Sequence, residues 1–312
     1  MSHTAFVYHD NYDLQFGEHV FPTVKYKLVR QTLMDRGILD PAELHAPEPA
    51  SDEDIALVHS QQWIRKLKFG TLTYDDVMRL EIPYSQQVVR AFWLAAGGTI
   101  LAARLSLKHG IGFNIGGGFH HAFPDHGEGF CAIHDVAIAA RRLQQDGLAV
   151  KVMIIDTDVH QGNGTAAIFA HDPNVFTLSI HQRNNYPEFK PPSTIDIHME
   201  DNAGDGEYLR RLSESCRLAI PGFKPDILFY VAGADPFCHD QLGGLNLTFD
   251  GLRERDRIVF ELACRERIPV VVTLAGGYAF DLNDTVRIHA STAEIGELTW
   301  KEMGNWGKSR LT

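Results

Sequence analysis

Short apolar runs alternate along the chain with longer segments whose apolar residues recur at helical spacing. The runs are nearly continuous rather than alternating, and glycine, aspartate or proline bounds each of the longer ones, which is typical of parallel strands buried on both faces. The predicted strands lie at 5–8, 111–115, 152–155, 227–231 and 270–274. The predicted helices between and beside them lie at 23–37, 85–109, 135–145, 207–220 and 251–265.

This alternation of strand and helix predicts βαβ units, and therefore an α/β fold with a parallel sheet sandwiched by helices. Ser51, followed by Asp52-Glu53-Asp54, supplies an N-cap with acids in the first turn of a further short helix. No linker or shift in composition divides the chain, so we predict one domain over 1–312 with a core from about 5 to 295. The end, 299–312, carries Trp300 and Trp306 among polar residues and is either a frayed tail or an oligomer contact.

Composition narrows the class of protein. The chain has 312 residues, of which 44% are hydrophobic and 22% are charged, which argues against intrinsic disorder. The net charge of −11 argues against binding to nucleic-acid phosphates but is compatible with a cationic substrate. Four scattered cysteines without a C-x-x-C pair indicate free thiols. We find no long apolar span and no signal peptide, so we expect a cytoplasmic protein without a membrane partner.

Polar residues gather where the predicted strands end, which is where open α/β sheets bind ligands. In Asp156-x-Asp158-x-His160 the three side chains project to one face of an extended backbone. Their oxygen and nitrogen donors suit a zinc-like divalent ion, and Asp235, at an equivalent strand end, can close the set. The pattern alone does not decide which of the four residues are ligands.

Two further strand ends carry groups suited to hydrolysis. A metal-assisted hydrolase also needs a general base and a donor to the oxyanion. His120 and His121 follow Gly116-Gly117-Gly118, and Tyr278 follows Gly276-Gly277, so both kinds of group are present. The 16 histidines of this acidic chain therefore include candidates for metal and proton chemistry.

Together these segments resemble the zinc-dependent histone deacetylase family, in the family's order and from about 5 to 295. The amino-acid sequence at 127–131 and 242–245 is most similar to the class IV branch and its bacterial amidohydrolase relatives. The resemblance implies the arginase-deacetylase fold. The segments that carry it are Gly117-Gly118-Phe119-His120-His121-Ala122, Gly127-Glu128-Gly129-Phe130-Cys131, Ile155-Asp156-Thr157-Asp158-Val159-His160-Gln161-Gly162-Asn163-Gly164, Gly233-Ala234-Asp235 and Gly276-Gly277-Tyr278.

The resemblance also implies a role for each site residue. The zinc ligands would be Asp158, His160 and Asp235. His121 would be the general base that later protonates the leaving amine, and His120 would be its electrostatic partner. The remaining implied roles are Tyr278 as donor to the tetrahedral oxyanion and Asp156 as the carboxylate that orients His120 without binding zinc.

Asn163 stands where many relatives have an aspartate, so we expect His121 to be less basic here than beside a carboxylate. The resemblance implies a structural monovalent cation, K⁺, bound by backbone oxygens and side chains of Asp156, Asp158, His160, Ser179 and Ile180. The predicted substrate channel is lined by Gly129, Phe130, Tyr186, Leu242, Gly276 and Gly277.

The implied activity is hydrolysis of the amide of an N-acyl-lysine in a protein or peptide. An acetylpolyamine amidohydrolase is the alternative, and the apolar Leu242 at the gatekeeper position favours acyl-lysine. A two-manganese ureohydrolase would need further carboxylates after Asp235, and a non-catalytic binding scaffold would have lost a ligand or the tyrosine. Acyl-chain preference and oligomeric state stay open.

Overall fold

The computed structural model describes residues 4–14, 17 and 19–303, and within them seven strands form one parallel sheet. The order across the sheet is β1-β2-β7-β6-β3-β4-β5, and every neighbouring pair is parallel. The strands are β1 (Thr4–Val7), β2 (Ile111–Asn114), β3 (Val152–Asp156), β4 (Val175–Gln182), β5 (Ile195–Met199), β6 (Ile227–Val231) and β7 (Val270–Thr273).

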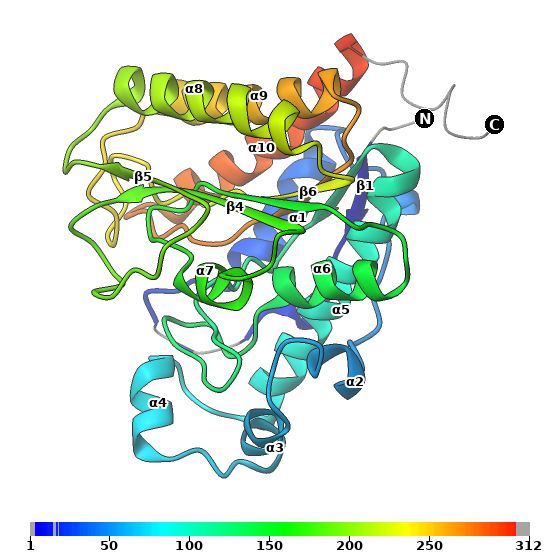
Figure 1. The fold of residues 1–312 in the computed structure, drawn as a ribbon, viewed down its shortest axis with the longest axis vertical. Coiled ribbons are helices and arrows are strands. Elements are labelled where there is room, and N and C mark those ends of the chain that lie inside the picture. Colours follow the sequence, from blue (N-terminus) through cyan, green and yellow to red (C-terminus); the bar gives the residue numbers. More distant parts are fainter. Residues whose placement is uncertain (1–3, 15–16, 18, 304–312) are drawn as a thin grey trace.

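Helices cover both faces of this sheet. Helices α8, α9 and α10 lie over one face, while α5, α6 and α7 lie under the other (Figure 1). The helices are α1 (Lys25–Asp35), α2 (Asp52–Ile55), α3 (Gln61–Phe69), α4 (Tyr74–Leu80), α5 (Gln86–His109), α6 (Asp135–Gln145), α7 (Asn163–Phe169), α8 (Asp205–Phe223), α9 (Phe249–Arg265) and α10 (Leu282–Met303). Two short 3-10 helices add Asp10–Tyr12 and Pro41–Glu43.

The predicted fold class is confirmed. All residues of β2, β3, β6 and β7 are buried, as their near-continuous apolar runs require. Ser51 caps α2 in a capping box: its side chain accepts a hydrogen bond from the Asp54 N–H, and the Asp54 side chain accepts one from the Ser51 N–H. In α5, the paired glycines admit close neighbours, since a Cβ on Gly97 would lie 1.9 Å from the backbone oxygen of Glu48.

Two strands were absent from the sequence prediction. β4 mixes apolar residues with Thr177, Ser179 and His181, and β5 is an edge strand with several half-exposed positions. Neither forms the apolar run by which the other strands were found. The loop that joins β4 to β5 begins after Gln182.

The C-terminal prediction is wrong in part. Thr299 to Met303 belong to α10, and Trp300 is fully buried with its ring 6.2 Å from that of Phe260. The residues around Trp300 are mostly polar, so the sequence pattern does not indicate that a helix with one apolar face continues to Met303. Trp306 lies outside the described residues.

Helix α5 is long and apolar enough, by length and composition, to cross a membrane, contrary to the sequence expectation. In the 18-residue stretch of α5 that meets this criterion, 72% is buried inside the protein. It packs against β1, β2 and β7 and against α6. This burial is that of a core helix covering a sheet.

Candidate metal centre and active site

Three predicted ligands converge beyond the carboxyl ends of β3 and β6. The candidate ligand atoms of Asp158, His160 and Asp235 all lie within 4.8 Å of one another, and the three side chains are buried. His160 Nδ1 lies 3.0 Å from Asp158 Oδ1 and 3.4 Å from Asp235 Oδ2. Backbone groups orient the carboxylates, because the Val159 N–H donates to Asp235 Oδ1 at 2.9 Å and the Gly276 N–H donates to Asp158 Oδ2 at 2.8 Å.

This arrangement fits a divalent cation. Asp235 Oδ2 is buried and accepts no hydrogen bond from the part of the chain that the structure describes. A Cβ at Gly276 would lie 2.0 Å from that oxygen, so the glycine keeps the space beside it free. Burial and the neighbouring Asp158 carboxylate raise the pKa of Asp235 to about 7, and a bound cation would relieve both penalties. Two carboxylates and one imidazole are a donor set that suits zinc and similar ions.

Asp156 lies beside this triad and bonds elsewhere. Its Oδ2 contacts His120 Nδ1 at 2.7 Å, and its Oδ1 accepts the Asp158 N–H at 3.1 Å. The structure thus separates Asp156 from the three candidate ligands, which the alternation of side chains could not do. It is also the register partner of Ser179 on β4, the strand that carries Ile180.

The two neighbouring histidines have opposite surroundings. Burial alone would lower the pKa of His120, but the Asp156 and Asp158 carboxylates outweigh it and raise the pKa to about 9. His121 Nδ1 faces the amide oxygen of Asn163 at 2.7 Å. Burial and the adjacent His120 and His160 hold the pKa of His121 well below its usual value. These surroundings favour the charged form of His120 and the neutral form of His121.

Tyr278 borders a narrow cavity above these groups. Burial and the Asp158 and Asp235 carboxylates raise the pKa of Tyr278 well above its usual value, so its hydroxyl stays a proton donor. Phe21 and Phe130 rings stack with centroids 5.9 Å apart, and the ring of Phe130 lies 6.1 Å from that of Tyr278. Residues lining this cavity include His121, Gly129, Phe130, Gly276 and Tyr278.

The other predicted channel residues are placed differently. The Tyr186 ring packs 4.9 Å from that of His121, at the border between the narrow cavity and a wider open pocket. Leu242 and Gly277 line neither cavity. Gly277 instead lies over Ala234 and Thr285, and the Leu242 carbonyl accepts a hydrogen bond from Asn185. That these two residues line the substrate channel stays a prediction.

Two charged residues near the site were missed. Lys25, on the first turn of α1, is fully buried; its Nζ donates to the Ala275 carbonyl at 2.7 Å and lies 5.6 Å from the Tyr278 ring centroid. Glu128 accepts hydrogen bonds from Asn163 and Tyr186. In the sequence, Lys25 is one polar position of the helix predicted at 23–37 and Glu128 is one residue of a glycine-containing motif, and neither pattern reveals burial.

Comparison with known proteins agrees with this geometry. The sequence profile of the histone deacetylase domain matches residues 19–293. Histone deacetylase 2 of Arabidopsis thaliana is 33% identical over 307 residues, which cover 94% of this chain and 79% of the relative. The chain belongs to the histone deacetylase family. As a member, it is a hydrolase of the deacetylase type.

Two further relatives and one solved structure are also similar to this chain. An uncharacterized protein of Picosynechococcus is 40% identical over 285 residues, covering 91% of this chain and 95% of the relative. The acetoin utilization protein AcuC of Staphylococcus aureus is 28% identical, covering 89% and 77%. The crystal structure of the HDA15 HD domain superposes with a TM-score of 0.80 at 23% identity, covering 96% of this chain and 89% of that one, which supports the fold.

Proposed function

We propose that this protein hydrolyses the amide of N-acyl-lysine in proteins or peptides, with zinc as its cofactor. The observation that carries the proposal is a narrow, aromatic-walled cavity lined by a neutral His121 and a protonated Tyr278, whose rings lie 6.0 Å and 6.4 Å from that of His160 in the buried candidate ligand triad. A slender aliphatic stem with an amide at its end matches that shape, since the walls contact the stem and the polar groups meet the amide.

Each chain group has a defined task in this proposal. Zinc bound by Asp158, His160 and Asp235 would polarise the acyl carbonyl and acidify the attacking water. His121 accepts the proton of that water at Nε2 and passes it to the leaving amine. The Tyr278 hydroxyl donates to the carbonyl oxygen as negative charge develops there.

The supporting groups act through these residues. Asp156 holds the His120 ring at 2.7 Å and keeps it cationic, which places positive charge beside the developing anion. The rings of Phe130 and Tyr186, which lie beside Tyr278 and His121, exclude water from the channel. A monovalent cation, K⁺, is proposed at Asp156, Asp158, His160, Ser179 and Ile180; the pairing of Asp156 with Ser179 across β3 and β4 supports it.

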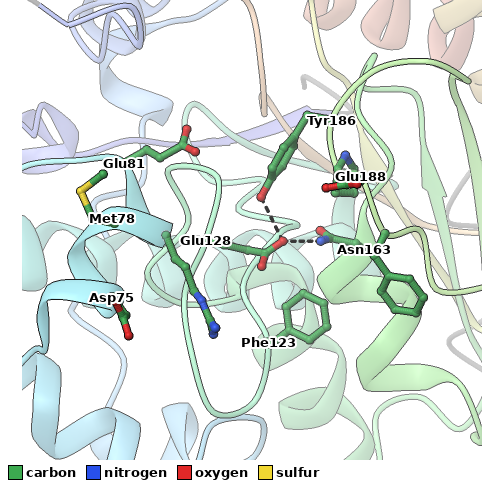
Figure 2. Close-up of a pocket in the computed structure, with 11 residues that line it drawn as sticks. Asp75, Met78, Glu81, Phe123, Glu128, Asn163, Tyr186 and Glu188 are labelled. Atoms are coloured by element: carbon green, nitrogen blue, oxygen red, sulfur yellow. Dashed lines mark hydrogen bonds between the residues drawn. The ribbon is translucent and has the colours of Figure 1, made fainter.

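A second candidate, an acetylpolyamine amidohydrolase, is favoured by the open pocket beside the channel. This pocket has a volume of about 540 Å³. It carries the carboxylates of Asp75, Glu81, Glu128 and Glu188 but a single guanidinium, that of Arg79 (Figure 2). A second ammonium group, on a polyamine or on a basic residue flanking the acyl-lysine, would be attracted to this rim.

One kinetic panel separates these candidates. Acetyl-, lactyl- and myristoyl-lysine peptides are compared with acetylated polyamines by kcat/KM, using metal-stripped and zinc-restored protein. The proposal expects peptide hydrolysis that disappears with the metal and returns with zinc. A strong polyamine preference would replace the substrate by the alternative, and turnover unaffected by complete metal removal would refute the mechanism.

A further inference from the structure

Glu128 lies at the border between the narrow channel and the open pocket. It belongs to the loop that links the two histidines to α6, and its side chain is 19% exposed. Figure 2 shows its carboxylate pointing between Tyr186 and Asn163, with hydrogen bonds to both. Of the acids around this pocket, it is the one that bonds to a partner of the catalytic histidine.

The contacts of Glu128 define its charge. Oε1 accepts hydrogen bonds from the amide nitrogen of Asn163 and from the Tyr186 hydroxyl, the latter at 2.9 Å, while Oε2 lies 3.4 Å from His126 Nε2. Burial would raise the pKa of Glu128, but hydrogen bonds from His126, Asn163 and Tyr186 outweigh it and lower the pKa. Glu81 faces it across the pocket and has a raised pKa through its own burial and this charge. Glu128 is therefore an anion at neutral pH.

An anionic carboxylate fixes the orientation of the amide beside it. A carboxylate can only accept hydrogen bonds, so the NH₂ group of Asn163 must face Glu128. The amide oxygen then faces the opposite way, where it accepts from His121 Nδ1 at 2.7 Å and from the Gly164 N–H at 3.0 Å. Because that oxygen cannot donate, Nδ1 of His121 carries the hydrogen and Nε2 keeps its lone pair.

We propose that Glu128 is a positioning residue for His121, acting through the Asn163 amide. Its negative charge pulls on the amide NH₂ and increases the electron density at the amide oxygen, which stabilises the imidazolium that forms when His121 accepts a proton. Glu128 thus supplies, one residue removed, the charge that an aspartate at position 163 would supply directly. This inference rests on the proposed function, in which His121 is the base.

Four variants test the relay. Glu128→Gln removes the charge and keeps the shape, and Asn163→Asp places two carboxylates in contact, which disfavours both ionising. The double variant Glu128→Gln/Asn163→Asp exchanges amide and carboxylate, so the amide now at position 128 can donate to the carboxylate now at position 163, which in turn accepts from His121. Glu297→Gln is the matched control, because Glu297 is a buried glutamate bonded to Thr4, far from the site.

On the best acyl-lysine peptide, we expect Glu128→Gln to lower kcat about 10- to 100-fold, the usual range for groups that orient site residues, with KM nearly unchanged. The kcat of Asn163→Asp should fall by a similar factor. The kcat of the exchanged double variant should recover to within about threefold of the wild-type value, since the hydrogen-bond relay is rebuilt in reverse order. Wild-type kcat in Glu128→Gln, or a double variant no better than the worse single variant, would overturn the proposal.

A second readout does not depend on turnover. In ¹⁵N-histidine-labelled, zinc-loaded protein, the Nδ1–H proton of His121, assigned by its loss in His121→Ala, should move upfield in Glu128→Gln and return in the exchanged variant. An unmoved resonance in Glu128→Gln would also overturn the relay. Should the wild type hydrolyse no acyl-lysine peptide, the proposed function fails while this spectrum still decides the role of Glu128.

Discussion

The site has two regions built in different ways. The metal floor (Asp158, His160 and Asp235) follows directly from the ends of β3 and β6, and backbone N–H groups hold its carboxylates. The loop wall (Glu128, Gly129, Phe130 and Tyr186) comes from two loops. The Tyr186 hydroxyl donates to Glu128 between them, and the Gly129 and Phe130 N–H groups donate to backbone carbonyls at the end of α4. The floor therefore inherits the rigidity of the sheet, whereas the wall depends on each contact that it makes.

This difference gives the regions different tasks. The floor brings two carboxylates together at a cost that a cation removes, so it is built to bind metal. The wall holds no metal ligand but contacts His121 and the channel, so it is built to position the base and the substrate. Substitutions in the floor should change metal content, and substitutions in the wall should change turnover alone.

Gly276→Ala changes the packing against the metal floor and should have the largest effect on metal content and turnover. Its Cβ would lie 2.0 Å from Asp235 Oδ2 and 2.5 Å from Asp158 Oδ2, so the ligands must move apart. We expect zinc content, measured by mass spectrometry, and turnover to be lost together. Gly206→Ala is the control, because a Cβ there meets nothing within 4 Å. Full zinc content in Gly276→Ala would show that the ligands tolerate this displacement and that Gly276 is not required for metal binding.

Tyr278→Phe separates chemistry from metal binding. In the proposed mechanism the hydroxyl donates to the developing oxyanion, so kcat should fall about 10²- to 10³-fold, the range for loss of one such donor. Zinc content should stay at the wild-type level, since Tyr278 is not part of the triad. Equal turnover in variant and wild type would remove Tyr278 from the mechanism.

Gly129→Ala adds a methyl group to the loop wall. Gly129 has a φ of +52°, and a Cβ would lie 2.8 Å from the His121 ring and 2.9 Å from that of Tyr186. A small displacement of the base should lower kcat about 10- to 100-fold while zinc content is kept. Loss of zinc in this variant would mean that floor and wall are not independent.

His59 bonds to residues on either side of Glu128, Gly129 and Phe130 in their loop, and its substitution should give the smallest effect. It contacts the Phe123 carbonyl through Nδ1 at 3.0 Å and accepts the His134 N–H at 2.9 Å. Burial lowers the pKa of His59 to about 4 in the folded protein, against an ordinary value of 6.5. The unfolded chain thus takes up this proton first, and stability present above pH 6.5 is lost as pH falls toward 4.

Urea unfolding at pH 7 and pH 5 measures this contribution. From pH 7 to pH 5 the shift of His59 removes about 2 kcal/mol of unfolding free energy. In His59→Gln, which can keep both hydrogen bonds, the loss of stability over this pH range should shrink by that amount. The same pH dependence in variant and wild type would assign the acid sensitivity to other groups.

The sequence predicted the floor better than the wall, for a physical reason. Strand ends in a parallel sheet meet at one edge, so the apolar runs alone were enough to bring Asp158, His160 and Asp235 together. Glu128 acquires its role from Asn163 and Tyr186, which are 35 and 58 residues away, and no local pattern encodes that meeting. The placement of Leu242 depends on loop geometry in the same way, since its carbonyl accepts a hydrogen bond from Asn185, 57 residues away.

The order of the sheet has a consequence for how the protein is made. β1 and β2 join the other five strands only through β7, which is near the end of the chain. During translation, the half of the sheet that leads into the histidine pair and the half that leads into the candidate ligands have no shared neighbouring strand until residues 270–273 leave the ribosome. We therefore expect the active site to be completed only after β7 has paired with β2 and β6, and a nascent chain truncated before β7 to hold no complete catalytic centre.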